Sequence, residues 1–195
     1  MDVEELHAEC AAVFVERVRL VRDGQWTLPT PCTEWTVRQL VNHMVAEQLW
    51  TPPMMAGERI ADVGDRFAGD VLGADPVATT ERAAKAAVRA AAEPVRAGRT
   101  VYLSFGDTPA GEYAMQLAAD HLVHAWDLSA AIGAGRVLPP GLVEQIAGWF
   151  TEREVWYRQG GVIDERPAAD DCGDRQRGLL IAFGRDPDWA AVRAG

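Results

Sequence analysis

Apolar residues recur at three- and four-residue spacing along most of this chain, which is the period of an α-helix with one buried face. The pattern is clear over residues 2–22, and Asp23-Gly24 follows it as a stop signal. We therefore predict a first amphipathic helix over residues 2–22. Its apolar stripe consists of Val3, Leu6, Cys10, Phe14, Val18 and Val21.

The second predicted helix has a well-marked start. Thr36 and Gln39 have the spacing of a capping box, in which each side chain bonds to the backbone of the other residue. Pro52-Pro53 lies beyond Trp50, and proline disfavours the helix interior because it lacks an N–H donor. We expect this helix to end just past Trp50.

The middle of the chain alternates between irregular and periodic segments. Residues 51–74 lack a steady period and predict a long loop with some local structure. Asp75-Pro76 is a cap followed by proline, so an alanine-rich helix is predicted from there to about Glu93. A turn over residues 94–100 should then lead into a short extended segment, Val101–Phe105, as a small hairpin or edge strand.

Three more helices are predicted in the C-terminal half. The longest begins at Thr108-Pro109 and closes at Gly133. Another runs from Pro140 to the Gly160-Gly161 pair, and a short one covers residues 174–183, with residues 162–173 as loop. Four long helices and two lesser ones, with almost no strand, predict an all-α four-helix bundle in a single domain spanning 1–195.

Composition narrows the class of protein. A hydrophobic fraction of 48% is typical of a globular chain with a core, whereas the net charge of −10 argues against nucleic acid and anionic membrane surfaces as partners. No basic start with an apolar run marks a signal peptide, so a cytoplasmic protein is expected. The three cysteines are widely spaced and predict neither disulfides nor a cysteine zinc site.

The segment D-H-L-V-H-A-W-D, residues 120–127, places metal-competent side chains on a helix that should be buried. Asp120 and His124 are four residues apart and therefore lie on the same helix face. His43 lies beside the apolar stripe of the second helix. Two stacked ligands facing a third from another helix are a common way to hold a metal in a bundle. Hydrogen-bonded histidines and a surface Asp–His pair would explain the same spacing.

Neighbouring residues leave alternatives open. His121 could ligate in place of Asp120 as an H-x-x-H pair with His124, or else pack in the bundle. Asp127 could orient a ligand or an arginine, or form an ordinary ion pair. Trp126 is expected in the core or in a pocket wall. Cys32 has no base adjacent in sequence, which favours packing over a nucleophilic role.

Three segments together resemble the DinB/YfiT-like metal-binding superfamily: T-P-C-T-E-W-T-V-R-Q-L-V-N-H-M (residues 30–44), H-L-V-H-A-W-D-L-S-A-A-I-G (121–133) and G-R-D-P-D-W (184–189). The resemblance covers nearly the whole chain. It is to the actinobacterial branch that is similar to the N-terminal domain of mycothiol-dependent maleylpyruvate isomerase. The resemblance implies a four-helix bundle that holds a divalent metal through three residues, here His43, Asp120 and His124.

This chain departs from the isomerase in two respects. Asp120 stands where the isomerase has glutamate, so the shorter ligand must approach more closely or bind through water. The isomerase also has an additional C-terminal domain, for which 195 residues leave little room. Both departures argue against maleylpyruvate as the particular substrate.

The chemistry implied by the resemblance is that of a metal-activated thiol. A thiol loses its proton on binding a metal, so bound mycothiol would attack an electrophile and give transfer or isomerisation. Two imidazoles and a carboxylate suit Zn²⁺, with Ni²⁺ or Fe²⁺ as alternatives.

Two other functions compete with this one. The first is metal-dependent hydrolysis, with Glu47 as general base for a metal-activated water. The second is a non-catalytic metal-binding protein whose site is closed by a fourth protein ligand, since structural zinc sites are closed in that way. A homodimer is possible under any of these functions.

Overall fold

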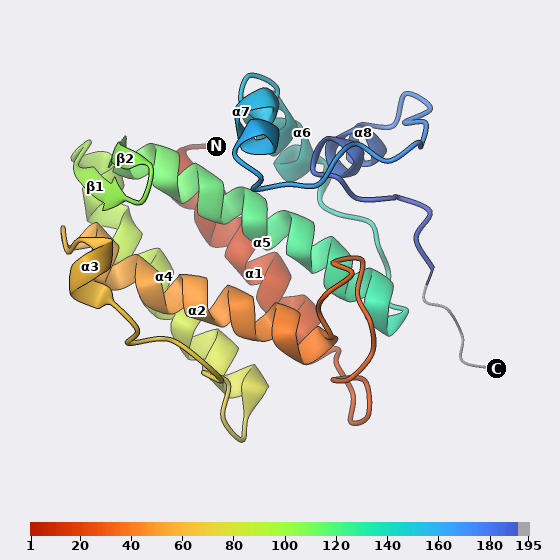
Figure 1. Ribbon diagram of the computed structural model, residues 1–195, viewed down its shortest axis with the longest axis horizontal. Coiled ribbons are helices and arrows are strands. Elements are labelled where there is room, and N and C mark those ends of the chain that lie inside the picture. The colour runs from red at the N-terminus through yellow and green to blue at the C-terminus, as the bar shows by residue number, and fades with distance from the viewer. Residues whose placement is uncertain (191–195) are drawn as a thin grey trace.

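The structure is a computed structural model and describes residues 1–190. Its centre is a bundle of four long helices, α1 (Val3–Arg19), α2 (Val37–Met55), α4 (Pro76–Arg96) and α5 (Ala110–Ile132) (Figure 1). Helices α1 and α2 each pack against both α4 and α5. The predicted all-α four-helix bundle is confirmed. None of the described helices combines the length and the apolar character that a membrane crossing requires.

Helix α5 is the most enclosed element of the bundle. It packs against α1, α2 and α4 on the bundle side and against α6 (Pro140–Phe150) on its other side. Residues 121–132 are therefore buried without interruption, including Trp126, which is 1% exposed. A polar side chain on this stretch has little access to bulk water and must find a protein partner or a ligand.

Two helices continue through prolines that were predicted to end them. Helix α2 includes Pro52-Pro53 and ends at Met55, and α4 passes Pro94 to end at Arg96. Met54 and Met55 are 1% and 3% exposed in a second apolar cluster, so their burial holds the last turn of α2 despite the missing N–H donors. Helix α1, by contrast, is shorter than predicted and ends at Arg19, three residues before the predicted boundary.

Short elements fill the segments between the long helices. The loop predicted over residues 51–74 contains the one-turn helix α3 (Ile60–Val63). Strands β1 (Thr100–Leu103) and β2 (Gly106–Pro109) pair antiparallel, with Val101 opposite Thr108, which confirms the small hairpin.

The C-terminal part lies over α5 on the side away from α2 (Figure 1). The single helix predicted from Pro140 is two helices, α6 and α7 (Glu154–Gln159), and α8 (Arg175–Ala182) follows. Phe150 and Phe183 stack with their ring centroids 3.9 Å apart, which fixes the end of α6 to the end of α8. The chain then turns at Gly184 and returns toward α5.

Gly184 is required at that turn for two reasons, and Gly184→Ala is expected to be strongly destabilising. Its φ of +76° is strained for an alanine, and an added Cβ would lie 2.8 Å from the carbonyl oxygen of Asp164. Gly173 has the same φ of +76° but no atom within 4 Å of such a Cβ. Gly173→Ala should therefore cost only the backbone strain of about 1 kcal/mol, and Gly184→Ala clearly more, in urea unfolding. Equal losses would contradict the close approach.

A buried polar group joins three helices inside the bundle. His121 of α5 donates from Nδ1 to the Leu117 carbonyl, 2.5 Å away, and its Nε2 lies 2.8 Å from the Gln48 amide nitrogen of α2. His7 of α1 lies beside it, with ring centroids 5.7 Å apart, and its Nε2 has no hydrogen-bond partner among residues 1–190. Burial lowers the pKa of His7 to about 3 and that of His121 to about 4, so both imidazoles stay neutral in the folded state.

This neutrality makes the fold sensitive to acid. Below pH 6.5 the unfolded chain protonates His7 while the folded chain does not, so stability falls as pH falls toward 3. We expect a slope of up to about 1.4 kcal/mol per pH unit from this residue. Urea unfolding between pH 7 and 5, with chelator present, should show a shallower slope for His7→Leu than for the parent protein. An unchanged slope would contradict the assignment.

Candidate metal centre

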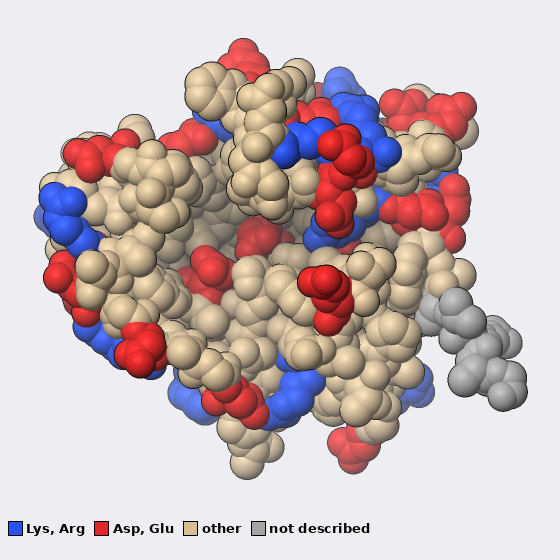
Figure 2. Space-filling view, viewed as in Figure 1, with Lys and Arg blue, Asp and Glu red and all other residues tan. Residues whose placement is uncertain are grey.

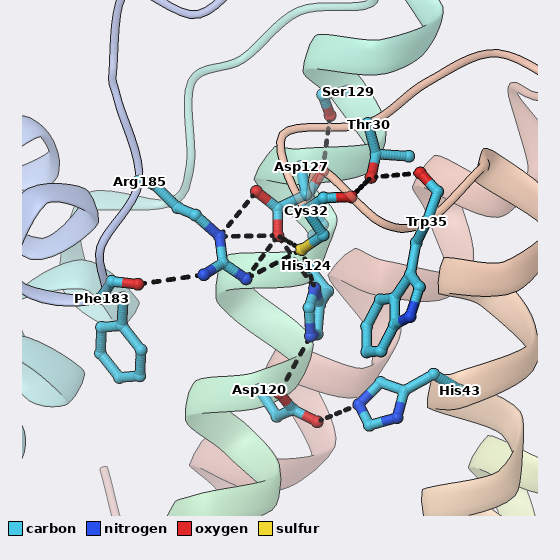
Figure 3. Close-up of polar contacts among 11 residues, drawn as sticks. Thr30, Cys32, Trp35, His43, Asp120, His124, Asp127, Ser129, Phe183 and Arg185 are labelled. Carbon is cyan, nitrogen blue, oxygen red and sulfur yellow. Dashed lines mark hydrogen bonds and ion pairs between the residues drawn. The ribbon is translucent and has the colours of Figure 1, made fainter. Parts of the chain in front are cut away.

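Helices α2 and α5 bring three polar side chains to one point (Figure 3). Asp120 and His124 lie one turn apart on α5, and His43 points toward them from α2. Asp120 Oδ2 is 3.4 Å from His43 Nε2, and Asp120 Oδ1 is 3.2 Å from His124 Nε2. One ligand atom from each residue lies within 4.8 Å of the other two. We call these three residues the triad.

The triad lines a cavity of about 1470 Å³ between the bundle and the C-terminal helices. The side chains of His43 and Asp120 are 30% and 35% exposed, whereas that of His124 is 6% exposed. Figure 2 shows the hollow in the face of the molecule. A metal held here would present its remaining coordination positions to the cavity, as in catalytic rather than structural metal sites.

The distances in the triad fit a small divalent ion. Ligand atoms about 2.0–2.1 Å from a tetrahedral Zn²⁺ lie roughly 3.3 Å from each other. The two oxygen–nitrogen separations of 3.4 and 3.2 Å, each to a different oxygen of Asp120, are of that size, so the Asp120 carboxylate lies close to both imidazoles. Two imidazoles and a carboxylate also suit Ni²⁺ or Fe²⁺.

Ion pairs within the triad and with Asp127 shift the pKa values of Asp120 and His124. Burial by itself would raise the pKa of Asp120, but His124 and His43 outweigh it and hold that pKa well below its usual range. Burial likewise opposes a charge on His124, yet the carboxylates of Asp120 and Asp127 raise its pKa well above the usual value. Because a metal-ligating imidazole is neutral, a cation bound here would replace the proton between His124 and Asp120.

Asp127 and Arg185 form a second layer behind the triad (Figure 3). His124 Nδ1 donates to Asp127 Oδ2 over 2.9 Å, which directs Nε2 toward the triad. Arg185 Nε lies 3.1 Å from both carboxylate oxygens of Asp127, whose side chain has no exposed surface. Asp127 therefore orients a candidate ligand and binds an arginine at the same time, which combines two of the roles foreseen for it.

Cys32 belongs to this second layer and is not simply packed in the core. Its Sγ lies 3.0 Å from Arg185 Nη2 and 3.3 Å from Asp127 Oδ2. Cys32, His124 and Asp127 form a second group with ligand atoms within 4.8 Å of one another. In this group the carboxylate of Asp127 already forms an ion pair with Arg185. Burial raises the pKa of the Cys32 thiol in spite of its hydrogen bond with His124.

Two other residues singled out from the sequence occupy different places. His121 lies outside both groups because its two ring nitrogens face Leu117 and Gln48. Glu47 lines the cavity, and burial together with the nearby Asp120 raises its pKa.

Sequence reasoning missed two contributors to this site. Trp35, just before the cap of α2, lies over His43 with ring centroids 4.7 Å apart. Arg185 belongs to the segment G-R-D-P-D-W, which carried the resemblance without a role for any of its residues. Only the turn at Gly184 brings Arg185 to α5, 58 residues after Asp127, so helical spacing gave no signal for the pair.

Fold and triad together define a helical bundle protein with a candidate centre for a divalent metal. The chain belongs to the family described as the mycothiol maleylpyruvate isomerase N-terminal domain, whose model matches residues 7–129. The matched region contains the whole triad, together with Cys32 and Asp127.

Similar proteins extend the likeness over most of the chain. An uncharacterised protein of Mycobacterium tuberculosis, found in two strains, is 32% identical over 175 residues, covering 86% of this chain and 89% of its own length. The crystal structure of a histidine-to-alanine mutant of the mycothiol-dependent maleylpyruvate isomerase has a TM-score of 0.61 and 16% identity. The match covers 84% of this chain and 72% of that one. At this identity the structural likeness supports the fold alone.

Proposed function

We propose that this protein binds a divalent metal through His43, Asp120 and His124 and uses it with a small-molecule thiol, for which mycothiol is the leading candidate. The observation that carries the proposal is the triad itself, open to a large cavity, in a chain of a family named for a mycothiol-dependent isomerase. A bound metal would supply thiol activation, because a coordinating thiol is deprotonated near neutral pH.

The residues around the metal position have distinct roles in this proposal. His43, Asp120 and His124 hold the ion, and Asp127 keeps the His124 ring in the tautomer that frees Nε2. Cys32 is not the reacting sulfur, because its thiol is hydrogen-bonded and its pKa is raised. In this proposal the reactive thiol comes from a cofactor, and the expected reaction is transfer to an electrophile or isomerisation.

The volume of the cavity supports a reaction between two molecules. Sites for drug-sized ligands span roughly 300–1,000 Å³. At about 1470 Å³ this cavity has room for a thiol cofactor and an electrophile together.

Metal-dependent hydrolysis is the second candidate, and one observation favours it. Glu47 faces the same cavity and has a raised pKa, which suits a residue that accepts and returns a proton. A non-catalytic metal site is less favoured, because the triad faces a cavity and no fourth metal-competent side chain joins it within the described residues.

Thiol consumption by the zinc-loaded protein tests the proposal. With mycothiol and monobromobimane, we expect conjugation at least about 100-fold faster than without protein, and near background with the Asp120→Ala variant or after chelation. Hydrolysis of activated esters without thiol would favour the second candidate. Absence of both activities in a fully loaded protein would favour a non-catalytic metal-binding protein.

A further inference from the structure

We propose that the cavity selects a substrate bearing a cationic nitrogen, such as an amine, and disfavours carboxylate-bearing electrophiles. This inference rests on the proposed function, since it concerns the molecule that would react beside the metal. It is carried by the charges and aromatic rings that line the cavity around the triad, taken together with the pairing of every basic side chain in that lining.

The lining of the cavity is strongly acidic. Seven carboxylates contribute to it, against two guanidinium groups, Arg153 and Arg185. Even with a divalent ion in the triad, four positive charges would face seven negative ones. The seven acidic residues are Glu34, Glu47, Asp107, Glu112, Asp120, Glu152 and Asp164.

Neither arginine is free to bind an anionic substrate. Arg153 holds Glu112 with two hydrogen bonds of 2.6 and 2.9 Å and also donates to the Trp149 carbonyl over 2.7 Å. Arg185 is engaged by Asp127 and by the Phe183 carbonyl. A substrate carboxylate would therefore have to displace an existing ion pair or bind at the metal itself.

Five of the lining acids have no basic partner in the part of the chain that the structure describes. Within residues 1–190, no lysine, arginine or histidine lies within ion-pair distance of Glu34, Glu47, Asp107, Glu152 or Asp164. All of these five except Glu47 are exposed, so their excess of negative charge acts as a field that attracts ligands of the opposite sign and is screened by salt.

Aromatic rings in the same lining point to the same class of ligand. Trp35, Trp156 and Tyr157 contribute to the cavity, and Trp156 is 78% exposed without a core role. The face of an indole or phenol ring attracts a cation, also at exposed sites. Acidic and aromatic groups around a metal position together favour an organic ammonium ion over a carboxylate.

Three small thiols of similar size test this inference on the cobalt-loaded protein. Cysteamine is cationic, 2-mercaptoethanol is neutral and 3-mercaptopropionate is anionic, and each can be titrated through its sulfur-to-cobalt absorption band. At low salt and equal thiolate concentration we expect cysteamine to bind at least about tenfold more tightly than 3-mercaptopropionate, with the preference reduced in 0.5 M NaCl.

Variants isolate the part of this preference that comes from the cavity. Glu47→Gln combined with Glu152→Gln should reduce the cysteamine preference at least about threefold, while Glu9→Gln combined with Glu16→Gln, on the exposed face of α1, should leave it unchanged. Comparing the same two thiols across variants cancels their intrinsic affinity for cobalt. Equal binding of the thiols, or tighter binding of the anion, would overturn the inference while leaving the proposed function standing. Absence of any sulfur-to-cobalt band would overturn both.

Discussion

The His124→Ala variant is expected to bind Zn²⁺ at least about 100-fold more weakly than the parent protein. His124 is the most buried member of the triad, and its Nε2 lies 3.2 Å from Asp120 Oδ1. Loss of a ligand should cost more than loss of an outer-shell partner, which typically lowers affinity about 10–100-fold. Competition with a chromophoric zinc chelator measures the affinity directly.

His121→Ala is the matched control for this prediction. His121 is the other histidine of the same helix, but its nitrogens face Leu117 and Gln48. Its replacement should lower stability, because a cavity forms and Gln48 loses a partner, yet zinc affinity should stay within about threefold of the parent value in the folded protein. A larger loss of affinity in His121→Ala than in His124→Ala would show that the wrong histidine was assigned to the metal.

Arg185→Gln is the second change with a large expected effect. Arg185 is the cation that pairs with the fully buried Asp127, and Asp127 in turn holds the His124 ring. Zinc affinity should fall about 10–100-fold, as for other outer-shell partners of a metal ligand. Stability should fall as well, by up to about 3–5 kcal/mol, because the buried Asp127 carboxylate would lose its arginine and keep only the hydrogen bond from His124.

Two companions of Arg185→Gln separate orientation of the ligand from general damage. Arg185→Lys keeps the charge but loses the forked geometry, so its zinc affinity should be intermediate. Arg177→Gln removes an arginine that pairs with Asp188 in the same C-terminal region, away from the triad. Its zinc affinity should equal that of the parent protein. Equal affinities in all three variants would contradict the role given to Arg185.

The bundle itself could be predicted because its helices carry their own signals. The capping box at Thr36 is present as predicted, and Gly133 ends α5 in the left-handed conformation that glycine favours. The boundaries at Pro52-Pro53 and Pro94 were wrong because burial of neighbouring side chains outweighed the preference of proline. Local sequence does not record that burial.

The candidate site could likewise be predicted only where local sequence positions its residues. Helical spacing placed Asp120 and His124 on one face and His43 beside the apolar stripe of another helix. The resemblance then singled out these three residues together, since periodicity within one helix cannot show which residue of another helix it meets. The parts that depend on long-range return of the chain were missed, above all Arg185 beside Asp127 and Cys32. Likewise, only the packing of α2 against α5 shows that the Gln48 amide contacts Nε2 of His121.

The most direct test of the metal assignment is a crystal structure of the zinc-loaded protein with anomalous diffraction data at the zinc edge. We predict one strong anomalous peak about 2.0–2.2 Å from His43 Nε2, an oxygen of Asp120 and His124 Nε2, with a remaining position open to the cavity. A peak at the alternative group of Cys32, His124 and Asp127 would contradict the account, as would a fourth protein ligand closing the site.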